Sequence, residues 1–170
     1  MISKPGLVAL LLFSVSVLFA QSQQIQTETH NHQNEHENER HRIHELGVSF
    51  APVYFFSEKE ISPSVHVHYT YSFPNTKFGL GLAYEHVFDD HQHNFFGLEG
   101  AFKPLHPLTL NFTPGITYEG AHPDKKEFAL HFETVYEFEV GKFHLGPVLE
   151  FAYHAEGYHM SLGLHVGLGL

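Results

Sequence analysis

The sequence contains no cysteine among its 170 residues. Disulfide bonds and metal sites built on thiolates are therefore both excluded. Basic residues are scarce as well, since nine Lys and Arg stand against 19 Asp and Glu, and the formal net charge is −10 with His counted as neutral. Phosphate binding needs clustered Lys and Arg, so this charge balance argues against a nucleic-acid partner.

Long apolar runs are confined to the N-terminus, where residues 7–19 follow Lys4 and precede Ala20. This pattern is typical of a secretory signal peptide covering residues 1–20, and it predicts export through the Sec pathway. An uncleaved anchor helix is the alternative, but the run is too short to span a bilayer as a helix. No later segment resembles a helical membrane span, so the remaining chain of about 150 residues is expected to form one domain.

From Glu45 to Leu170 the sequence alternates large apolar residues with small or polar ones. Near the C-terminus, Tyr158, Met160 and Leu162 fall on one face, while His159 and Ser161 fall on the other. A period of two indicates extended strands, because successive side chains point to opposite sides of a sheet. The apolar face is bulky and the other face is too polar for a dry core. We therefore expect a closed barrel with lipid outside and polar groups inside.

Turn signals divide this region into eight expected strands, each long enough to cross an outer membrane at a tilt: Glu45–Phe56, Ser64–Phe73, Lys77–Phe88, Asn94–Phe102, Leu108–Tyr118, Glu127–Val140, Phe143–His154 and Gly157–Leu170. An even number of antiparallel strands that close on themselves leaves both termini on one side and no exposed edge. Short connections at 74–76, 103–107 and 141–142 are expected on the periplasmic side. Longer ones at 57–63, 89–93, 119–126 and 155–157 are expected to face outward.

Outward aromatic residues are expected to form two belts at lipid headgroup level, with an aliphatic band between them. The outer belt would hold Tyr54, Phe56, Tyr84, Phe88, Phe96, Tyr118, Phe128, Tyr153 and Tyr158, and the periplasmic belt Tyr71, Phe73, Phe78, Phe102, Phe138 and Phe143. Pro52, Pro114 and Pro147 fall inside expected strands, where each removes a ladder hydrogen bond, so bulges are expected there.

This pattern resembles the small eight-stranded outer-membrane β-barrels of Gram-negative bacteria, the OmpX-like and OmpA-barrel-like group of the porin superfamily. The resemblance covers Glu45 to Leu170 and rests on the alternation rather than on a signature motif. It implies an all-β, antiparallel, up-and-down transmembrane barrel in the cell outer membrane, with the lipid bilayer as its partner. One departure is Leu170, where such barrels usually end in an aromatic residue. A soluble lipocalin-type barrel or sandwich is the alternative, but its interior would be too narrow for so many large rings.

Histidine is unusually frequent, and five candidates lie before the expected barrel. Residues 21–44 are predicted to form a disordered, His-rich periplasmic segment, because residues 29–45 contain almost no apolar residue. Such tracts bind Zn, Ni or Cu ions through neutral imidazoles. The candidate ligands there are His30, His32, His36, His41 and His44. A solvated low-complexity linker is the alternative, because their spacing is not that of a structural zinc site.

Inside the barrel, alternation predicts a group of inward His and Glu residues in the outer half of the lumen. They are His66, His68, Glu85, Glu99, His131, Glu133, Glu150, His154 and His159, with Glu137, His144 and His165 lying lower. Two interpretations remain open: a site for Zn, Ni or Cu, or a polar packing network of His–Glu pairs. The stretch Asp89–His93 could also capture a metal ion for a neighbouring outer-membrane importer, or be an ordinary hydrophilic loop.

The sequence therefore predicts a non-enzymatic barrel with a structural or surface-interaction role, and transition-metal binding as the sharper hypothesis. A lipid-modifying hydrolase is one alternative, because His159 and Ser161 are similar to the His-x-Ser pair of the outer-membrane lipid A deacylases. No acidic residue follows Ser161, however, where one would orient the histidine base. A narrow pore is the other alternative, and bulky Glu and His side chains would obstruct it.

Overall fold

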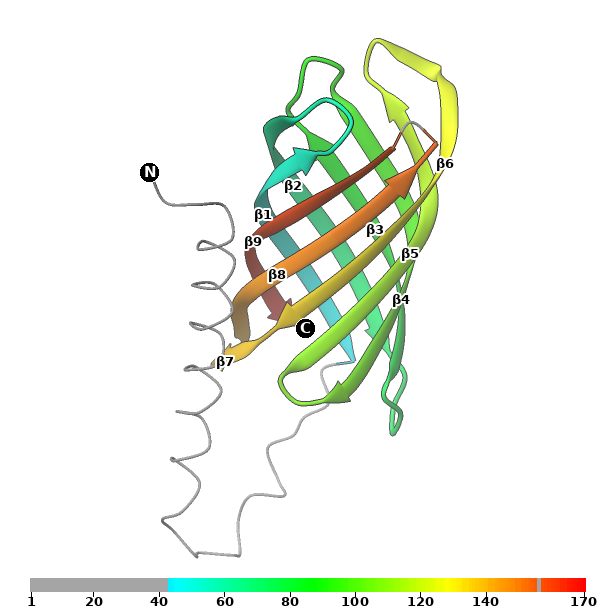
Figure 1. Cartoon of the computed structure of the whole chain (residues 1–170). Helices are drawn as coiled ribbons and strands as arrows, with labels where there is room; N and C mark the ends of the chain where they lie inside the picture. Colours follow the sequence, from blue (N-terminus) through cyan, green and yellow to red (C-terminus); the bar gives the residue numbers. More distant parts are fainter. Residues whose placement is uncertain (1–42, 156) are drawn as a thin grey trace, which may run out of the picture. The chain divides into compact units, whose positions relative to one another are not determined.

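The computed structural model describes residues 43–155 and 157–170, which form one antiparallel sheet closed into a barrel (Figure 1). The strands are β1 (His44–Phe55), β2 (Glu60–Ser72), β3 (Phe78–Val87), β4 (His93–Leu105), β5 (Leu108–Glu119), β6 (His122–Tyr136), β7 (Phe138–Val140), β8 (Phe143–His154) and β9 (Gly157–Gly169). They pair in the order β6-β5-β4-β3-β2-β1-β9-β8-β7, and a β6–β8 pairing closes the ring.

Strands β6 and β7 are two parts of the sixth predicted strand, which is interrupted at Glu137. The backbone N–H of Glu137 donates to the Pro107 carbonyl at 2.9 Å, next to the Leu108–Tyr136 pair, whereas pairing with β8 is missing at Tyr136 and Glu137. On both sides of this break the strand pairs with β8. The predicted eight-stranded, all-β antiparallel barrel is thus confirmed for the part of the chain that the structure describes. Within that part, no helix has the length and apolar character needed to span a membrane.

The barrel has two ends, which we call the terminal rim and the distal rim. At the terminal rim the Leu170 N–H donates to the His44 carbonyl at 2.9 Å, and the turns 73–77, 106–107 and 141–142 lie at the same end. The distal rim carries the turns 56–59, 88–92 and 120–121 and the β8–β9 connection.

The expectation that the distal connections are the longer ones is wrong. Strand β2 already begins at Glu60 and β6 at His122, so most of the predicted loops 57–63 and 119–126 belong to strands. Pairing continues there, with Ile61 opposite Tyr54 and Lys126 opposite Tyr118. Charge and proline in these segments suggested loops, whereas backbone pairing extends through them.

Side-chain alternation places the apolar residues outside and the polar residues inside. In β8, Phe143, Leu145 and Leu149 are exposed, whereas His144 and Glu150 are buried. Exposed large apolar side chains occur on every strand of the described barrel. Most buried apolar residues are Ala or Val, and a small cluster is formed by Val53, Phe55 and Val87. The barrel is therefore apolar outside and polar inside, as the alternation predicted.

Aromatic rings gather near both rims, as expected. Near the distal rim the Phe56 ring centroid lies 4.9 Å from Tyr54 and 4.7 Å from Tyr158. Near the terminal rim Phe78 stacks on Phe102 at 5.0 Å. The expected aliphatic band between them is wrong in part, because the rings of Phe112 and Phe132 pair at 4.9 Å in the middle of β5 and β6.

The predicted bulges at the three strand prolines are wrong. Pro52 pairs with Pro63 of β2, and pairing with β9 is missing at Pro52 while the register on either side stays unchanged. Pro114 and Pro147 likewise pair with one neighbouring strand and leave a gap toward the other. A missing N–H removes one ladder bond without inserting a residue, so the register is kept. Register shifts occur nearer the rims instead, between Phe102 and Leu105 and between Tyr118 and Glu119.

Candidate metal centre

The inward-facing residues of the strands fill the lumen with carboxylate and imidazole groups. The buried side chains of these two types are Glu45, Glu85, Glu99, Glu133, Glu137, Glu150, His66, His68, His93, His131, His144, His154, His159 and His165. An eight-stranded barrel is just wide enough for side chains to fill its interior. Burial of charge is costly unless the charge is paired or binds a metal, so the partners of these groups define what the lumen can do.

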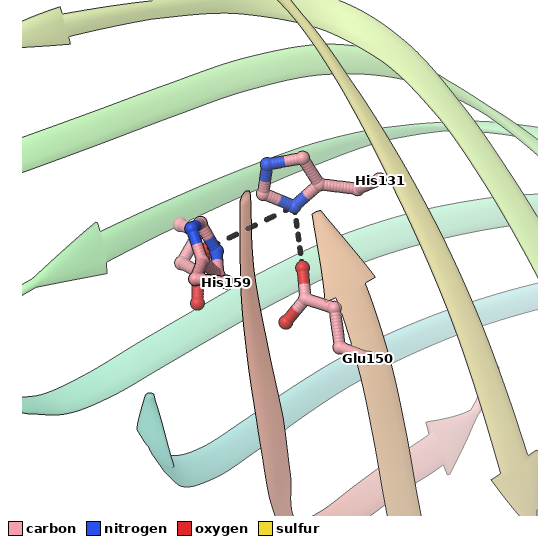
Figure 2. Close-up of side chains that lie close together, drawn as sticks. His131, Glu150 and His159 are labelled. Atoms are coloured by element: carbon pink, nitrogen blue, oxygen red, sulfur yellow. Dashed lines mark hydrogen bonds and ion pairs between the residues drawn. The ribbon is translucent and has the colours of Figure 1, made fainter. Parts of the chain in front are cut away.

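Four of them form what we call the distal cluster: Glu85 of β3, His131 of β6, Glu150 of β8 and His159 of β9. One candidate ligand atom from each lies within 4.8 Å of the other three. His131 Nδ1 makes a short hydrogen bond with Glu150 Oε1 and lies 3.7 Å from Glu85 Oε2. His159 Nε2 lies 4.0 Å from the same oxygen of Glu85. Figure 2 shows His131 and Glu150 turned toward each other, with His159 beside them.

Neighbouring side chains hold one half of the distal cluster in place. The His131 ring stacks on Phe95, with centroids 3.6 Å apart and planes 11° apart. Ser161 Oγ donates to Glu150 Oε2 at 3.3 Å. These contacts restrict the orientation of the two groups, as outer-shell partners of metal ligands do.

The other half of the cluster carries unsatisfied polar atoms. Within the described residues, Glu85 Oε1 and both ring nitrogens of His159 have no hydrogen-bond partner. Leaving a buried donor or acceptor unsatisfied costs about 1–3 kcal/mol. A cavity of about 10 Å³, lined by Glu85, His131 and His159, adjoins these atoms, enough for about one water-sized particle.

The donor set fits a divalent transition-metal ion. Imidazole nitrogen and carboxylate oxygen are ordinary ligands of Zn²⁺, and imidazole also suits Ni²⁺ and Cu²⁺. When both carboxylates of the cluster are ionised, one divalent cation would balance their two negative charges. Two His and two Glu supply four ligands, the number that zinc binds in structural sites.

A second group, which we call the terminal cluster, consists of Glu45 of β1, His68 of β2 and His165 of β9. Candidate ligand atoms of these three residues lie within 4.8 Å of one another. Two groups in between share members with the clusters: His66 with Glu133 and Glu150, and His66 with His68 and Glu99. In these, His66 Nδ1 lies 3.3 Å from Glu133 Oε2 and His68 Nδ1 lies 3.1 Å from Glu99 Oε2.

The nine predicted lumen residues therefore do not gather in a single layer. Glu85, His131, Glu150 and His159 converge, and His66 and Glu133 lie beside them. His154 lies nearer the distal rim, its ring centroid 5.8 Å from His159 and 6.1 Å from His93. His68 and Glu99 belong with Glu45 toward the terminal rim. The reason is geometric, because two inward residues of one strand, such as His66 and His68, are about 6.6 Å apart along it.

Of the predicted tail ligands, His30, His32, His36 and His41 lie outside the described residues. His44 was wrongly assigned to the tail, because it is the first residue of β1 and its Nδ1 lies 2.6 Å from the Tyr69 hydroxyl. Pairing with Tyr71 of β2 extends the strand to this residue.

The segment 89–93, which was predicted to be a surface metal site, is only partly a loop in the structure. His93 is the first residue of β4, and Asp89 accepts hydrogen bonds from its ring and, at 3.0 Å, from its backbone N–H. The pair therefore closes the β3–β4 turn, with both side chains largely buried. Of the candidate ligands in the predicted capture loop, Asp89 and His93 are therefore engaged with each other, and Asp90 and His91 remain exposed.

Sequence reasoning missed the terminal cluster as a ligand set. Alternation correctly placed His165 in the lower lumen, and the same parity applies to Glu45. What brings Glu45, His68 and His165 together is the pairing of β1 with both β2 and β9, in which Gly47 lies opposite His68 and Gly167. Strands β1 and β9 are neighbours only because the barrel is closed, and the spacing of residues along the sequence does not show this.

No protein-family model and no curated protein sequence matches this chain. Among solved structures, it is similar to Neisserial surface protein A, with a TM-score of 0.51 and 9% identity over 75% of this chain and 96% of that one. It is also similar to the outer membrane protein Ail of Yersinia pestis (TM-score 0.47, 12% identity, 73% and 97% covered) and to the N-terminal barrel of OprF of Pseudomonas aeruginosa (TM-score 0.47, 16% identity, 73% and 96% covered). The chain thus has the fold of the small eight-stranded outer-membrane barrels, and the similarity concerns the fold alone.

Proposed function

We propose that this protein is a small outer-membrane barrel, exported across the inner membrane, with a structural or surface-interaction role. Exposed Phe, Leu and Tyr side chains surround the described barrel. A water-soluble protein seldom exposes a contiguous apolar surface of more than a few hundred Å². Apart from the three-residue β7, the strands have 10–15 residues, which is long enough for a tilted strand to cross a bilayer, since such a strand needs about 9–11 residues.

We infer further that the distal cluster binds one divalent transition-metal ion. The observation that carries this proposal is the meeting of two imidazoles and two carboxylates from four strands, with His159 unsatisfied on both ring nitrogens among the described residues. A packing network alone would be expected to leave few such atoms without partners. A cation would satisfy them and balance the two carboxylates.

The geometry favours neither of the alternatives. Ser161 donates its hydroxyl to Glu150, and both Ser161 and His159 are buried in the lumen, away from the surface where lipid would lie. The His-x-Ser arrangement needs the histidine base within hydrogen-bond reach of the serine, whereas the Ser161 hydroxyl is directed to Glu150. Side chains fill the lumen, which argues against a pore. Planar-bilayer conductance tests that point, with no steady channel current expected.

Calorimetric titration with Zn²⁺ and Ni²⁺ tests the metal proposal. The full chain is used with His30, His32, His36 and His41 replaced by Asn, so that the N-terminal imidazoles do not contribute. We expect a binding event with a Kd near 1 μM, about −8 kcal/mol. His159→Asn should weaken that event at least tenfold.

His122→Asn is the matched control, since His122 is exposed at the distal rim and should leave the titration unchanged. Folding of each variant is checked by its heat-dependent mobility on gels. Binding weaker than about 100 μM in the parent, or an unaltered titration in both His159→Asn and Glu85→Gln, overturns the proposal. Outer-membrane location is tested separately by fractionating cell envelopes on a density gradient.

A further inference from the structure

The terminal cluster is built differently from the distal one, and each of its imidazoles is held at one nitrogen. His68 Nδ1 lies 3.1 Å from Glu99 Oε2, and Thr70 Oγ1 donates to the other oxygen of Glu99 at 2.5 Å. His165 Nδ1 lies 3.1 Å from Ser49 Oγ. Both histidines are almost completely buried. Anchoring Nδ1 to an oxygen is how proteins fix the tautomer and ring direction of a metal-binding histidine.

The opposite nitrogens of these rings point at one carboxylate oxygen. His68 Nε2 lies 3.9 Å and His165 Nε2 lies 3.8 Å from Glu45 Oε1. Within the described residues, neither Nε2 atom has a hydrogen-bond partner. These distances are too long for hydrogen bonds, which require about 2.7–3.2 Å.

The same distances suit a bridging ion. With metal–ligand bonds of 2.0–2.1 Å, two ligand atoms lie about 3.3 Å apart at a tetrahedral angle and about 4.1 Å apart when they are opposite each other. The two Nε2–Oε1 separations fall inside this range. Lys103 Nζ binds the other oxygen of Glu45 at 3.2 Å, so Oε1 remains available. His144 Nε2 also lies 3.8 Å from Glu45 Oε2 and its Nδ1 lies 3.6 Å from Glu137 Oε2.

Two glycines make the room for these rings. Gly47 of β1 lies directly opposite Gly167 of β9. A methyl group at Gly47 would overlap the His68 imidazole and lie 2.6 Å from His165 Cε1, and one at Gly167 would lie 3.1 Å from His165 Nε2. The space between β1 and β9 is therefore shaped by residues without side chains.

The local charge also fits a divalent cation. Three carboxylates lie in this half of the lumen, on Glu45, Glu99 and Glu137, together with the single ammonium group of Lys103. With the imidazoles neutral, three negative charges and one positive charge leave two negative charges. One divalent ion would balance them. Because two of the three donors are imidazole nitrogens, the ion class is Zn²⁺, Co²⁺, Ni²⁺ or Cu²⁺ rather than Mg²⁺ or Ca²⁺.

We propose that Glu45, His68 and His165 form a second transition-metal site, near the terminal rim and separate from the distal cluster. The two sets share no residue, so the barrel holds two ions at once. Each intermediate group shares one residue with a proposed site, His68 with the terminal cluster and Glu150 with the distal cluster. These groups therefore add no third ion when both sites are filled. The inference requires the barrel fold but not the distal site.

Titration of the full chain with Co²⁺ tests this, with His30, His32, His36 and His41 replaced by Asn. Visible absorption of the bound Co²⁺ reports the geometry and calorimetry the number of ions. We expect two ions per chain. His165→Asn should remove one of them, with at least a tenfold loss of affinity, because an Asn amide replaces the Nδ1 contact with Ser49 but not Nε2. Glu45→Gln should have the same effect.

Histidine side-chain ¹⁵N NMR with Zn²⁺ supplies a readout that does not depend on a variant folding. The Nε2 signals of His68 and His165 should shift on binding, while their Nδ1 signals move less. Unchanged Nε2 signals, or unchanged Co²⁺ stoichiometry in both His165→Asn and Glu45→Gln, overturn the proposal. If His159→Asn leaves the titration unaltered while His165→Asn removes the one ion bound, the distal site fails and the terminal site stands.

Discussion

Glu99 offers the sharpest test of how the lumen is stabilised. Its carboxylate is fully buried and accepts hydrogen bonds from Thr70 Oγ1 at 2.5 Å and from His68 Nδ1 at 3.1 Å. Each hydrogen bond to a charged group contributes about 1.5–3 kcal/mol, and breaking a buried pair by removing one partner costs about 3–5 kcal/mol. We therefore expect Glu99→Ala to lower the free energy of unfolding by about 3–5 kcal/mol.

A double-mutant cycle that combines Glu99→Ala with Thr70→Val separates the energy of the Thr70–Glu99 hydrogen bond from the energy lost through changes in packing. In the parent, Thr70→Val leaves Glu99 Oε1 without its donor and should cost about 1.5–3 kcal/mol. In the Glu99→Ala background the hydroxyl has already lost its acceptor, so the same change should cost close to nothing. The measurement is equilibrium urea unfolding in lipid vesicles with a chelator present. Thr134→Val, on the exposed face of β6, is the control. A cost for Thr70→Val that is equal in both backgrounds, within about 0.5 kcal/mol, would refute the reasoning.

Three further predictions follow from other parts of the barrel. Gly47→Ala should destabilise the barrel by about 1–3 kcal/mol and shift the NMR signals of His68 and His165, whereas Gly100→Ala, whose nearest neighbouring atom would be 3.6 Å away, should do neither. Leu82→Arg, on the outward face in the middle of β3, should lower the free energy of unfolding in lipid vesicles by about 2–4 kcal/mol, whereas Ile61→Arg near the distal rim should lower it by about 1 kcal/mol or less. Equal losses for the two variants in urea unfolding would contradict a bilayer around the barrel. Ser161→Ala should lower the free energy of unfolding by about 1 kcal/mol and leave the mass spectrum of the cell's lipid A unchanged. If lipid A from cells with the variant carries an acyl chain that lipid A from cells with the parent protein lacks, the hydrolase alternative is restored.

The alternation of the sequence predicted the fold closely, because a period of two is a local property. It correctly placed residues such as Leu82 outside and Glu85 inside, and it divided the chain at almost every turn. The strand ends at Glu60 and His122 were missed, because pairing with a neighbouring strand extends through charged segments that suggest loops when considered alone.

The lumen was less predictable, because neighbours across it depend on the closed ring. The alternation of the sequence identified His66 and His68 as inward. It could not show that Glu133 lies next to His66 and that Glu99 lies next to His68. Glu45 was missed as a ligand for the same reason. It lies at the start of the first strand, and His165 lies near the end of the last one.

The pairing of β1 with β9 has a further consequence for assembly. Glu45 and His165 stand on opposite sides of this seam, where the first and the last strand pair, so their ligand set exists in the closed barrel and not in an open sheet. An ion that binds there adds RT ln(1 + [ion]/Kd) to the stability of the closed form, about 2.7 kcal/mol at one hundred times Kd. The stability of the closed barrel would then depend on the concentration of the metal ion around the protein. A chelator would lower that stability while leaving the hydrogen bonds between β1 and β9 in place.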